Sequence, residues 1–482
     1  MISDGSTADE VRAALDALRR SDLPTTGGRT LAYVYDSGLA EADALGREAL
    51  AAYGGTNGLD PTAFPSLRAM EQDLVTTAAD LLDGPPGTVG TVTSGGTESL
   101  LLAVQTARDS RPDVARPAMV LPTSAHASFH KAGHYFGVRC HFVDVDPETG
   151  RADAAAMAEA ISPDTVLVVA SAPSYAHGVV DPVTEIAAAA AAHGVRCHVD
   201  ACIGGWLLPY LRRDDPTLRP FAFDVPGVTS VSVDLHKYAY APKGTSLLLY
   251  RDSALRRPQL FASAAWPGYT MLNSTLQSTK SGGPLAAAWA VTRYIGDSGY
   301  AELARTVRRG VEALVAGVDR IDHLRVLCTP ESSLVAVTAD ASVDVFSIAD
   351  ELLARGWYAQ PQLRFGPFPA SLHLSVSAAT VPLLPEFLVA LGQAVDAVVA
   401  TGPIGVDPQV RGALAAVDPA TLDDAGFDAL LTLAGLGAAG GSGGLALPER
   451  MAPVNALLDL APPPLREALL RGFLDRISRP DR

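Results

Sequence analysis

Short apolar runs alternate with helical segments from about residue 87 to residue 250, and this alternation restricts the fold more than any other feature of the chain. Strands are predicted at 89–93, 117–121, 138–143, 165–170, 195–199, 229–233 and 245–250, with helices between them near 97–109, 126–136, 152–160 and 183–193. Strands that alternate with helices form crossover units and a mostly parallel sheet covered on both faces. The sequence therefore predicts an α/β fold built on such a sheet.

The chain has 482 residues, which is enough for two or three domains with large cores. We predict an N-terminal segment over 1–75, a large sheet-containing domain over 76–300 and a smaller α+β domain over 301–482. In the last region, strands are predicted at 324–328, 333–338 and 371–376, and helices near 345–355, 382–400 and 463–477. The glycine-rich stretch 435–444 is predicted to be a flexible loop.

Charge and cysteine content restrict the partners of the protein. The net charge is −16 and no basic block offsets it, which argues against nucleic-acid and anionic-membrane partners. The four cysteines are scattered without paired spacing, as expected in a reducing compartment. No run reaches 18 apolar residues and the N-terminus lacks the pattern of a signal peptide. We therefore expect a soluble, cytoplasmic protein.

Lys237 follows the predicted strand 229–233 in the sequence Asp-Leu-His-Lys, and Pro242 and Gly244 then interrupt the chain before the next strand. A lysine held where the backbone leaves a sheet can form a Schiff base with an aldehyde cofactor, usually pyridoxal phosphate (PLP). An isolated turn lysine is more often a solvated side chain. The interpretation therefore depends on what the other strand ends carry.

Those strand ends carry the other contacts that a PLP ring needs. Gly95, Gly96 and Thr97 lie between a strand and a helix, where backbone and a helix N-terminus can hold a phosphate. Asp200 ends a strand and can keep a pyridine nitrogen protonated. Each feature alone has a structural alternative, a tight turn or a turn-capping aspartate. Because ligands of such sheets bind at the carboxyl ends of the strands, the combination predicts a PLP site.

Two histidines complete the predicted cofactor site. His126 opens a predicted helix and can stack on the cofactor ring, and His236 can donate to the phosphate beside Lys237. His130 and His134 follow His126 at i+4 and i+8, so a metal site is an alternative. No carboxylate or thiolate lies at matching spacing, and we predict no metal. A nucleotide site is also disfavoured, because the chain has neither a Gly-x-Gly-x-x-Gly fingerprint nor a Walker loop.

With these residues in view, the chain resembles the sphingosine-1-phosphate lyase family, within the PLP-dependent (group II) decarboxylase superfamily of fold type I. The matching segments are 91–103 (TVTSGGTESLLLA), 126–137, 173–182 (PSYAHGVVDP), 198–209 (HVDACIGGWLLP) and 233–244 (VDLHKYAYAPKG). Weaker similarity extends from about residue 29 to the C-terminal helix. The membrane anchor of the family's eukaryotic members is expected to be absent.

The resemblance implies roles for four residues that contact cofactor or substrate. It assigns Lys237 to the covalent bond with PLP, Asp200 to the pyridine nitrogen and His126 to stacking on the ring. Lys243 would be a second functional lysine close to the substrate. Lys237 or Lys243 would then move protons during catalysis, as bases tuned by burial and by neighbouring cations.

The resemblance also implies how the phosphate is held and how subunits assemble. Gly96, Thr97 and His236 would hold the cofactor phosphate. The protein would be a homodimer with its active sites at the interface. Residues 278–283, Gly282 among them, would reach into the partner's site.

Two departures from the family concern the substrate. Where the family has histidines near the substrate entrance, in Val-Tyr-His-Gly-Gly and Asn-Pro-Leu-His-Pro, this chain has Asp36 and Asp60. A carboxylate about 4 Å from a phosphate charge costs on the order of 4 kcal/mol at an effective dielectric constant of ~20. One hypothesis is that the substrate carries no phosphate at this end. The alternative is that both aspartates face solvent.

The expected reaction is cleavage of a carbon–carbon bond in an amine or amino-acid-like substrate, by retro-aldol chemistry. Amino-acid decarboxylation is the alternative, because the same electron sink serves both reactions. A PLP-binding protein without turnover is a third possibility. It is disfavoured because a protein that only binds PLP has no need of the electron sink that Asp200 would support.

Overall fold

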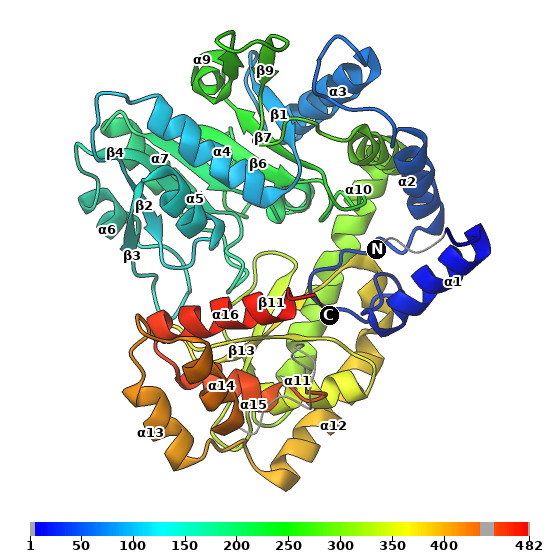
Figure 1. Cartoon of the computed structure of the whole chain (residues 1–482), viewed down its shortest axis with the longest axis vertical. Coiled ribbons are helices and arrows are strands. Elements are labelled where there is room, and N and C mark those ends of the chain that lie inside the picture. Colours follow the sequence, from blue (N-terminus) through cyan, green and yellow to red (C-terminus); the bar gives the residue numbers. More distant parts are fainter. Residues whose placement is uncertain (1–4, 434–447, 481–482) are drawn as a thin grey trace.

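Seven strands form the central sheet of the upper lobe (Figure 1). They are β1 (Val89–Thr93), β2 (Ala118–Pro122), β3 (Arg139–Val143), β4 (Thr165–Ser171), β5 (Arg196–Asp200), β6 (Val228–Asp234) and β7 (Ser246–Tyr250). Their order is β1-β7-β6-β5-β4-β2-β3, and only β7 runs antiparallel to its neighbours. The prediction of an α/β fold with a mostly parallel sheet is confirmed. The computed structural model describes residues 5–433 and 448–480, so the glycine-rich stretch 435–444 lies outside the described residues.

Strand sequence explains why this sheet is central. β2 and β4 are buried along their whole length, which is typical of parallel strands covered on both faces. The covering helices are α4 (Gly96–Asp109), α5 (Ser128–Phe136), α6 (Ala154–Glu159), α7 (Val183–Ala192), α8 (Leu208–Asp214) and α9 (Ser253–Arg256). The predicted helix 126–136 begins two residues late, at Ser128, because Nδ1 of His126 accepts the backbone N–H of Ser128 at 3.2 Å.

The N-terminal helices and a long connecting helix lie along one side of the molecule (Figure 1). They are α1 (Ala8–Leu18), α2 (Ala40–Ala52), α3 (Pro65–Leu81) and α10 (Gly282–Val318), which runs from the upper lobe into the lower lobe. Gly296 interrupts α10 with φ 64° and ψ 174°, a conformation open to glycine and strained for other residues. A short hairpin, β8 (Phe261–Ser263) and β9 (Met271–Asn273), precedes α10.

The lower lobe contains a second, antiparallel sheet in the order β10-β11-β13-β12. The strands of this sheet are β10 (Leu324–Val326), β11 (Leu334–Ala339), β12 (Gln360–Gln362) and β13 (Ser371–Ser375). The lower lobe also contains the helices α11 (Val345–Ala354) and α12 (Leu384–Thr401). β12 was not predicted, since Gln-Pro-Gln has no apolar alternation. Because α10 belongs to both lobes, the domain boundaries at 75 and 300 stay predictions.

Four further helices form a module at the end of the chain: α13 (Pro408–Ala416), α14 (Asp424–Leu433), α15 (Ala452–Leu460) and α16 (Pro463–Ile477). Only α16 was predicted. The module has its own small core, which includes Leu414 and Leu465. Buried Asp459 anchors it by accepting hydrogen bonds from the backbone N–H and the Nε of Arg364, both at 2.6 Å.

Residues 378–401, which contain α12, are the one helical stretch within the described residues that is long and apolar enough to cross a membrane. Core helices of globular proteins can have the same length and apolar composition. Phe387, Leu391 and Val395 of α12 are buried, and the helix packs against α10 and α11. This burial is typical of a core helix.

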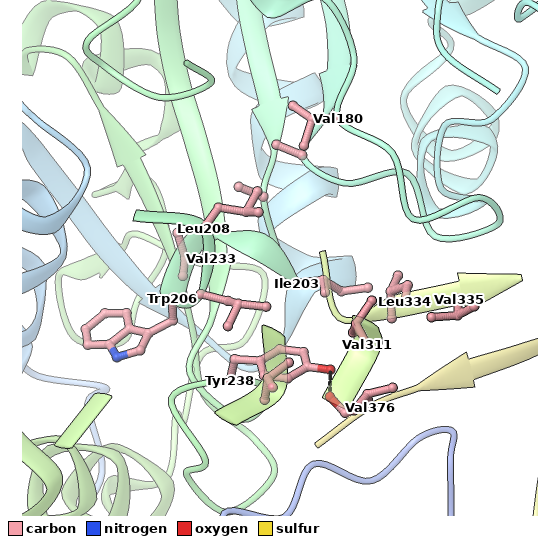
Figure 2. Close-up of a cluster of buried hydrophobic side chains, with 14 of the residues drawn as sticks. Val180, Ile203, Trp206, Leu208, Val233, Tyr238, Val311, Leu334, Val335 and Val376 are labelled. Carbon is pink, nitrogen blue, oxygen red and sulfur yellow. Dashed lines mark hydrogen bonds between the residues drawn. The ribbon is translucent and has the colours of Figure 1, made fainter. Parts of the chain in front are cut away.

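One continuous apolar core joins the two lobes (Figure 2). Ile203 and Val233 come from the upper lobe, and Leu334 and Val376 from the lower one. Tyr238 lies between them, is buried, and donates its hydroxyl to the carbonyl oxygen of Val376 at 2.9 Å. Since Tyr238 follows Lys237 in sequence, the core fixes the backbone from which that lysine extends.

Candidate active site

A cavity of about 590 Å³ lies at the edge of the large sheet where the parallel strands end. Its lining includes Ser94–Glu98 after β1, His126 after β2, Pro173 and Tyr175 after β4, Asp200 and Cys202 at and after β5, and Asp234, His236 and Lys237 at and after β6. Parallel strands bring their carboxyl ends to one edge, so residues far apart in sequence meet there. The structure thus brings together the predicted Gly95, Gly96, Thr97, His126, Asp200, His236 and Lys237.

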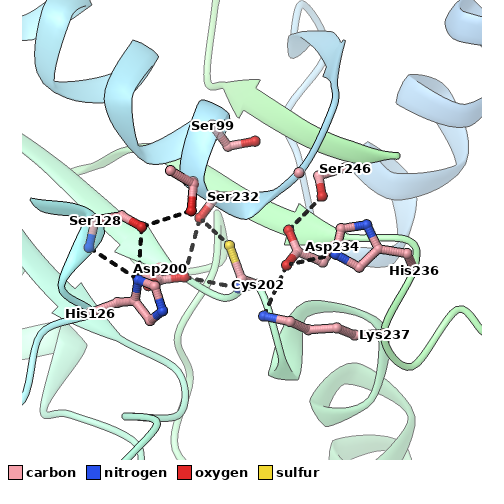
Figure 3. Close-up of polar contacts among 12 residues, drawn as sticks. Ser99, His126, Ser128, Asp200, Cys202, Ser232, Asp234, His236, Lys237 and Ser246 are labelled. Carbon is pink, nitrogen blue, oxygen red and sulfur yellow. Dashed lines mark hydrogen bonds and ion pairs between the residues drawn. The ribbon is translucent and has the colours of Figure 1, made fainter. Parts of the chain in front are cut away.

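Lys237 forms an ion pair that the sequence analysis did not identify. Its Nζ lies 2.9 Å from Oδ2 of Asp234, whose carboxylate is 2% exposed (Figure 3). Ser246 donates to the other oxygen of Asp234 at 2.6 Å, and Nε2 of His236 lies 3.5 Å from Oδ2. Desolvation by burial is the largest single influence on the pKa of Lys237 and lowers it, but the charge and hydrogen bond of Asp234 together with the neighbouring Tyr35 and Cys202 outweigh it, so the pKa is raised above its ordinary value. Lys237 is therefore held as a cation in this structure.

Asp200 lies on the other side of the cavity, at the end of β5 (Figure 3). Its Oδ1 accepts the backbone N–H of Cys202 at 3.1 Å and the hydroxyl of Ser232 at 3.4 Å. Within the described part of the chain, Oδ2 has no hydrogen-bond partner. This oxygen remains free for a cationic N–H of a ligand.

His126 is connected through hydroxyl groups to residues 94–97, the glycine loop that leads from β1 into α4. Its Nδ1 lies 2.9 Å from Oγ of Ser128 (Figure 3). That Oγ lies 2.9 Å from Oγ1 of Thr97. The imidazole lies edge-on to Tyr175, with ring centroids 6.4 Å apart. These contacts fix the histidine at the wall of the cavity, above the sheet edge that carries Asp200.

Gly96 in the glycine loop lies too close to its neighbours for a side chain. A Cβ on Gly96 would lie 2.8 Å from Oδ2 of Asp234 and 2.9 Å from Sγ of Cys202. Beside the loop, Nδ1 of His236 is buried and has no hydrogen-bond partner among the described residues. Buried polar atoms are nearly always paired. An unpaired ring nitrogen next to the N-terminus of α4 suits a phosphate oxygen.

The residues of the cavity fit PLP. Free N–H groups at the start of α4 and the unpaired nitrogen of His236 suit its phosphate, the free Oδ2 of Asp200 suits its ring nitrogen, and Lys237 suits its aldehyde. The individual roles remain predictions. Cys202 and Asp234 were missed as lining residues, although both lie within two or three residues of a predicted one.

Tyr175 was also missed, although the segment that contains it was noted. It stacks on His373 with ring centroids 4.1 Å apart, and its hydroxyl donates to Oε1 of Gln360 at 2.6 Å. The only signal for Tyr175 in the sequence is its position shortly after the buried strand β4. Its position between the two lobes depends on β12 and β13, which lie almost two hundred residues further along the chain.

Two predicted site residues lie outside the cavity lining. Nζ of Lys243 donates to the carbonyl oxygens of Tyr33 at 2.8 Å and His236 at 3.4 Å, which places it beside the cavity. Gly282 starts α10, and its N–H donates to the carbonyl oxygen of Thr56 at 3.0 Å. Its predicted role in a partner's site stays a prediction.

The two aspartates that depart from the family have local partners. Asp36 is buried and accepts the backbone N–H groups of Gly27 at 2.7 Å and Gly38 at 2.8 Å. The alternative that both aspartates face solvent is therefore wrong for Asp36. Asp60 is exposed and accepts from the N–H and the hydroxyl of Thr62. Neither lines the cavity of this chain.

The histidine series does not form a metal site in this structure. His126 precedes α5, while His130 and His134 are exposed on it. The described residues contain no group of three or more His, Cys, Asp and Glu side chains that could hold a metal ion. The helix begins only at Ser128, so His126 lies outside it and the i+4 spacing does not place His126 and His130 on one helix face.

Comparison with known proteins supports the cofactor assignment. The family described as "pyridoxal-dependent decarboxylase conserved domain" matches residues 32–339. The family described as "pyridoxal-dependent enzyme, C-terminal putative HTH domain" matches residues 408–476, which contain α13 to α16. The fold, the cavity and these matches define a PLP-dependent enzyme of the decarboxylase superfamily.

Similarity to individual proteins identifies the family within this superfamily. The sphingosine-1-phosphate lyase of Dictyostelium discoideum is 38% identical over 352 residues, which are 73% of this chain and 65% of that protein. The lyase of Arabidopsis thaliana is 36% identical over 407 residues, which are 82% of this chain and 73% of that protein. The solved structure of the Burkholderia pseudomallei lyase has a TM-score of 0.76 at 32% identity, covering 82% of this chain and 92% of that one. The chain belongs to the sphingosine-1-phosphate lyase family. It spans about two thirds of the length of the Dictyostelium relative.

Proposed function

We propose that this protein is a PLP-dependent carbon–carbon lyase that cleaves a phosphorylated sphingoid base into a fatty aldehyde and a phosphorylated amino alcohol. The observation that carries the proposal is the 32% identical lyase structure, which superimposes over 82% of this chain with a TM-score of 0.76. A sphingoid base has an amine on the carbon next to a hydroxyl-bearing carbon. That arrangement is the one that retro-aldol cleavage requires.

The cavity supplies the groups that this reaction needs. When bound, PLP supplies an electron sink for the carbon that bears the amine. Lys237 is placed to hold the cofactor and afterwards to carry a proton at its Nζ. The carboxylate of Asp200 is placed to stabilise positive charge at the cofactor ring. A base must still remove the proton of the substrate hydroxyl.

The structure removes one argument against a phosphorylated substrate. Asp36 was expected to repel a substrate phosphate, but both of its carboxylate oxygens accept backbone N–H groups, from Gly27 and Gly38. Hydrogen bonds to a carboxylate spread its charge over neighbouring donors. We infer that this buried carboxylate stabilises the loop between residues 27 and 38 and does not serve to repel a substrate phosphate.

The proposal is tested by product analysis with three substrates: sphingosine 1-phosphate, unphosphorylated sphingosine, and a mixture of amino acids. We expect a long-chain aldehyde and phosphoethanolamine from the first substrate only. Cleavage of unphosphorylated sphingosine at equal or higher efficiency would support the hypothesis of a substrate without phosphate. Release of carbon dioxide from an amino acid, without aldehyde from either lipid, would identify a decarboxylase instead.

Lys243 is the candidate for the base, and it makes the reaction depend on pH. It is exposed on one side, yet desolvation of its Nζ and the charge of Lys237 lower its pKa to about 8. Only the neutral amine accepts a proton, so kcat/KM should be low below pH 8 and rise as the pH passes through about 8. Lys243→Arg, which stays cationic, should flatten this rise and lower kcat/KM on the alkaline side by on the order of 10²-fold.

The control for this pH profile is Lys131→Arg, the same change at a lysine on the cavity rim. It should keep the rise near pH 8. A wild-type profile that is flat from pH 6 to 10, or an unchanged rise in Lys243→Arg, would show that another group is the base.

A homodimer is the proposed assembly, and exposed apolar surface supports it. The segment from 260 to 276 exposes six large apolar side chains, Leu260, Phe261, Trp266, Tyr269, Leu272 and Leu276. α1 has no buried residue and exposes Val11, Leu15 and Leu18 along one face. Apolar patches of this kind mark contacts with other proteins, and Leu276 at the end of the 260–276 patch lines the cavity.

Sedimentation velocity should give twice the chain mass for the purified protein. The double change Phe261→Glu and Leu272→Glu should shift it to the mass of one chain and should lower activity. Val389→Glu, at an equally exposed position on α12, should leave the mass unchanged. A wild-type protein that sediments as a single chain would contradict the proposed assembly.

A cytoplasmic location without nucleic-acid or membrane partners is also proposed. All four cysteines are free, which suits a reducing compartment. The C-terminal region 408–476 contains five arginines and no lysine, against eight acidic residues. An acidic module of this kind does not provide the positive surface that binds a phosphate backbone.

A further inference from the structure

Glu98 connects the two walls of the cavity at the end where the cofactor phosphate is expected. It lies in the first turn of α4 and is 7% exposed. Its Oε2 accepts the backbone N–H of Ser94 at 2.6 Å. Its Oε1 accepts the backbone N–H of Leu276 at 2.9 Å and that of Gln277 at 3.3 Å. One carboxylate therefore holds two segments that are about 180 residues apart.

Both segments line the cavity. Ser94 begins the glycine loop, and Leu276 and Gln277 follow the exposed β8–β9 hairpin. No strand pairing joins the two segments in the described residues, because β8 and β9 form a separate two-stranded sheet. Lys280 ties the residues that follow to β1, through the carbonyl oxygen of Val92 at 2.8 Å. The carboxylate of Glu98 is the side chain that bonds directly to both the 276–277 wall and the glycine loop.

A general structural role does not account for this arrangement. An acidic side chain in a first turn is favourable for any helix, but that effect needs neither burial nor contacts with a distant segment. A buried carboxylate is costly unless it is paired or hydrogen-bonded. Glu98 has no cationic partner among the ion pairs of the described chain, and all three of its donors are backbone N–H groups. All three hydrogen bonds of the Glu98 carboxylate therefore hold backbone segments in position.

We propose that Glu98 is a positioning residue that fixes the glycine loop against the 276–277 wall and thereby sets the affinity of the protein for PLP. The proposal rests on the cofactor site described above, and it adds a residue that makes no contact of its own with cofactor or substrate. It also couples the site to the 260–276 patch, because the same carboxylate holds the end of that segment.

Glu98→Gln and Glu98→Asp separate this role from that of charge alone. Glutamine keeps the length, but its amide nitrogen cannot accept an N–H, so one side of the connection is lost. Aspartate keeps the charge at the helix N-terminus but is too short to reach both segments. We expect both variants to bind PLP on the order of 10-fold to 100-fold more weakly than wild type, measured by absorbance titration of the cofactor-free protein.

A second readout needs no cofactor. In the cofactor-free variants, amide hydrogen exchange over 274–281 should be faster than in wild type, while the midpoint of thermal unfolding should change little. The matched control is Glu71→Gln: Glu71 also accepts a backbone N–H, from Val92 at 2.7 Å, and contacts Lys280, but it does not line the cavity. This control should bind PLP like wild type.

The outcomes distinguish this proposal from the proposed function. If Glu98→Asp binds PLP as tightly as wild type, the charge alone matters and the positioning role is overturned. Equal weakening in Glu71→Gln would overturn it as well, because any lost carboxylate in this region would then have the same effect. If the wild-type protein itself binds no PLP, the cofactor assignment fails and Glu98 is not the cause.

Discussion

Replacing Lys237 with alanine is expected to reduce kcat by at least about a thousandfold and to destabilise the cofactor-free protein as well. The first effect follows from losing the amine that holds the cofactor and carries a proton. The second follows from Asp234, which is 2% exposed and pairs with Nζ at 2.9 Å. Removing one partner of a buried ion pair leaves an uncompensated charge and costs about 3–5 kcal/mol.

Lys237→Arg separates these two effects. Arginine keeps a positive charge opposite Asp234 but cannot bond covalently to an aldehyde, so it should restore much of the stability and none of the activity. The measurements are kcat, the free energy of unfolding in urea, and the visible absorption of the protein after addition of PLP. An alanine variant that keeps its turnover, or that forms the same PLP spectrum as wild type, would refute the role of Lys237.

The fold of the upper lobe could be predicted because burial on both faces leaves a direct trace in sequence. Most strands of the large sheet are short buried runs, although β3 at the sheet edge is only partly buried. Each predicted run in 87–250 coincides with a strand to within a residue or two. The lower lobe was harder. β12 reads Gln-Pro-Gln, and α13 to α15 are short helices, of which α15 packs mainly against α11 and α14 packs against α13 and α16. Their positions depend on tertiary contacts such as that of Asp459 with Arg364.

Much of the candidate site could be predicted for a related reason. Residues that end parallel strands meet at one edge, so Asp200 and Lys237 could be expected to lie together from the strand order alone. Asp234 could not. Its burial depends on β7 running antiparallel beside β6, which pairs Asp234 with Ser246 and closes the carboxylate between them. Glu98 was missed for the same reason, because its partners at 276 and 277 are far away in sequence.

The second large effect is expected for Asp200→Asn, which should lower kcat by about 10²-fold to 10⁴-fold with little change in PLP binding. Asparagine has nearly the same shape, and its oxygen can still accept the N–H of Cys202 and the hydroxyl of Ser232. What it lacks is the negative charge next to the cofactor ring nitrogen. Because Lys237 and the glycine loop are unaltered, the loss should fall on kcat rather than on cofactor affinity.

Ser232→Ala provides the control, since it removes a hydrogen bond to the same oxygen of Asp200 and leaves the charge in place. It should cost less than about tenfold in kcat, as expected for one neutral hydrogen bond. Comparing the two variants at saturating PLP and substrate measures the charge apart from the geometry. An Asp200→Asn enzyme within tenfold of wild type would mean that the ring nitrogen needs no anionic partner, and the electron sink would then have to be maintained by other groups in the cavity.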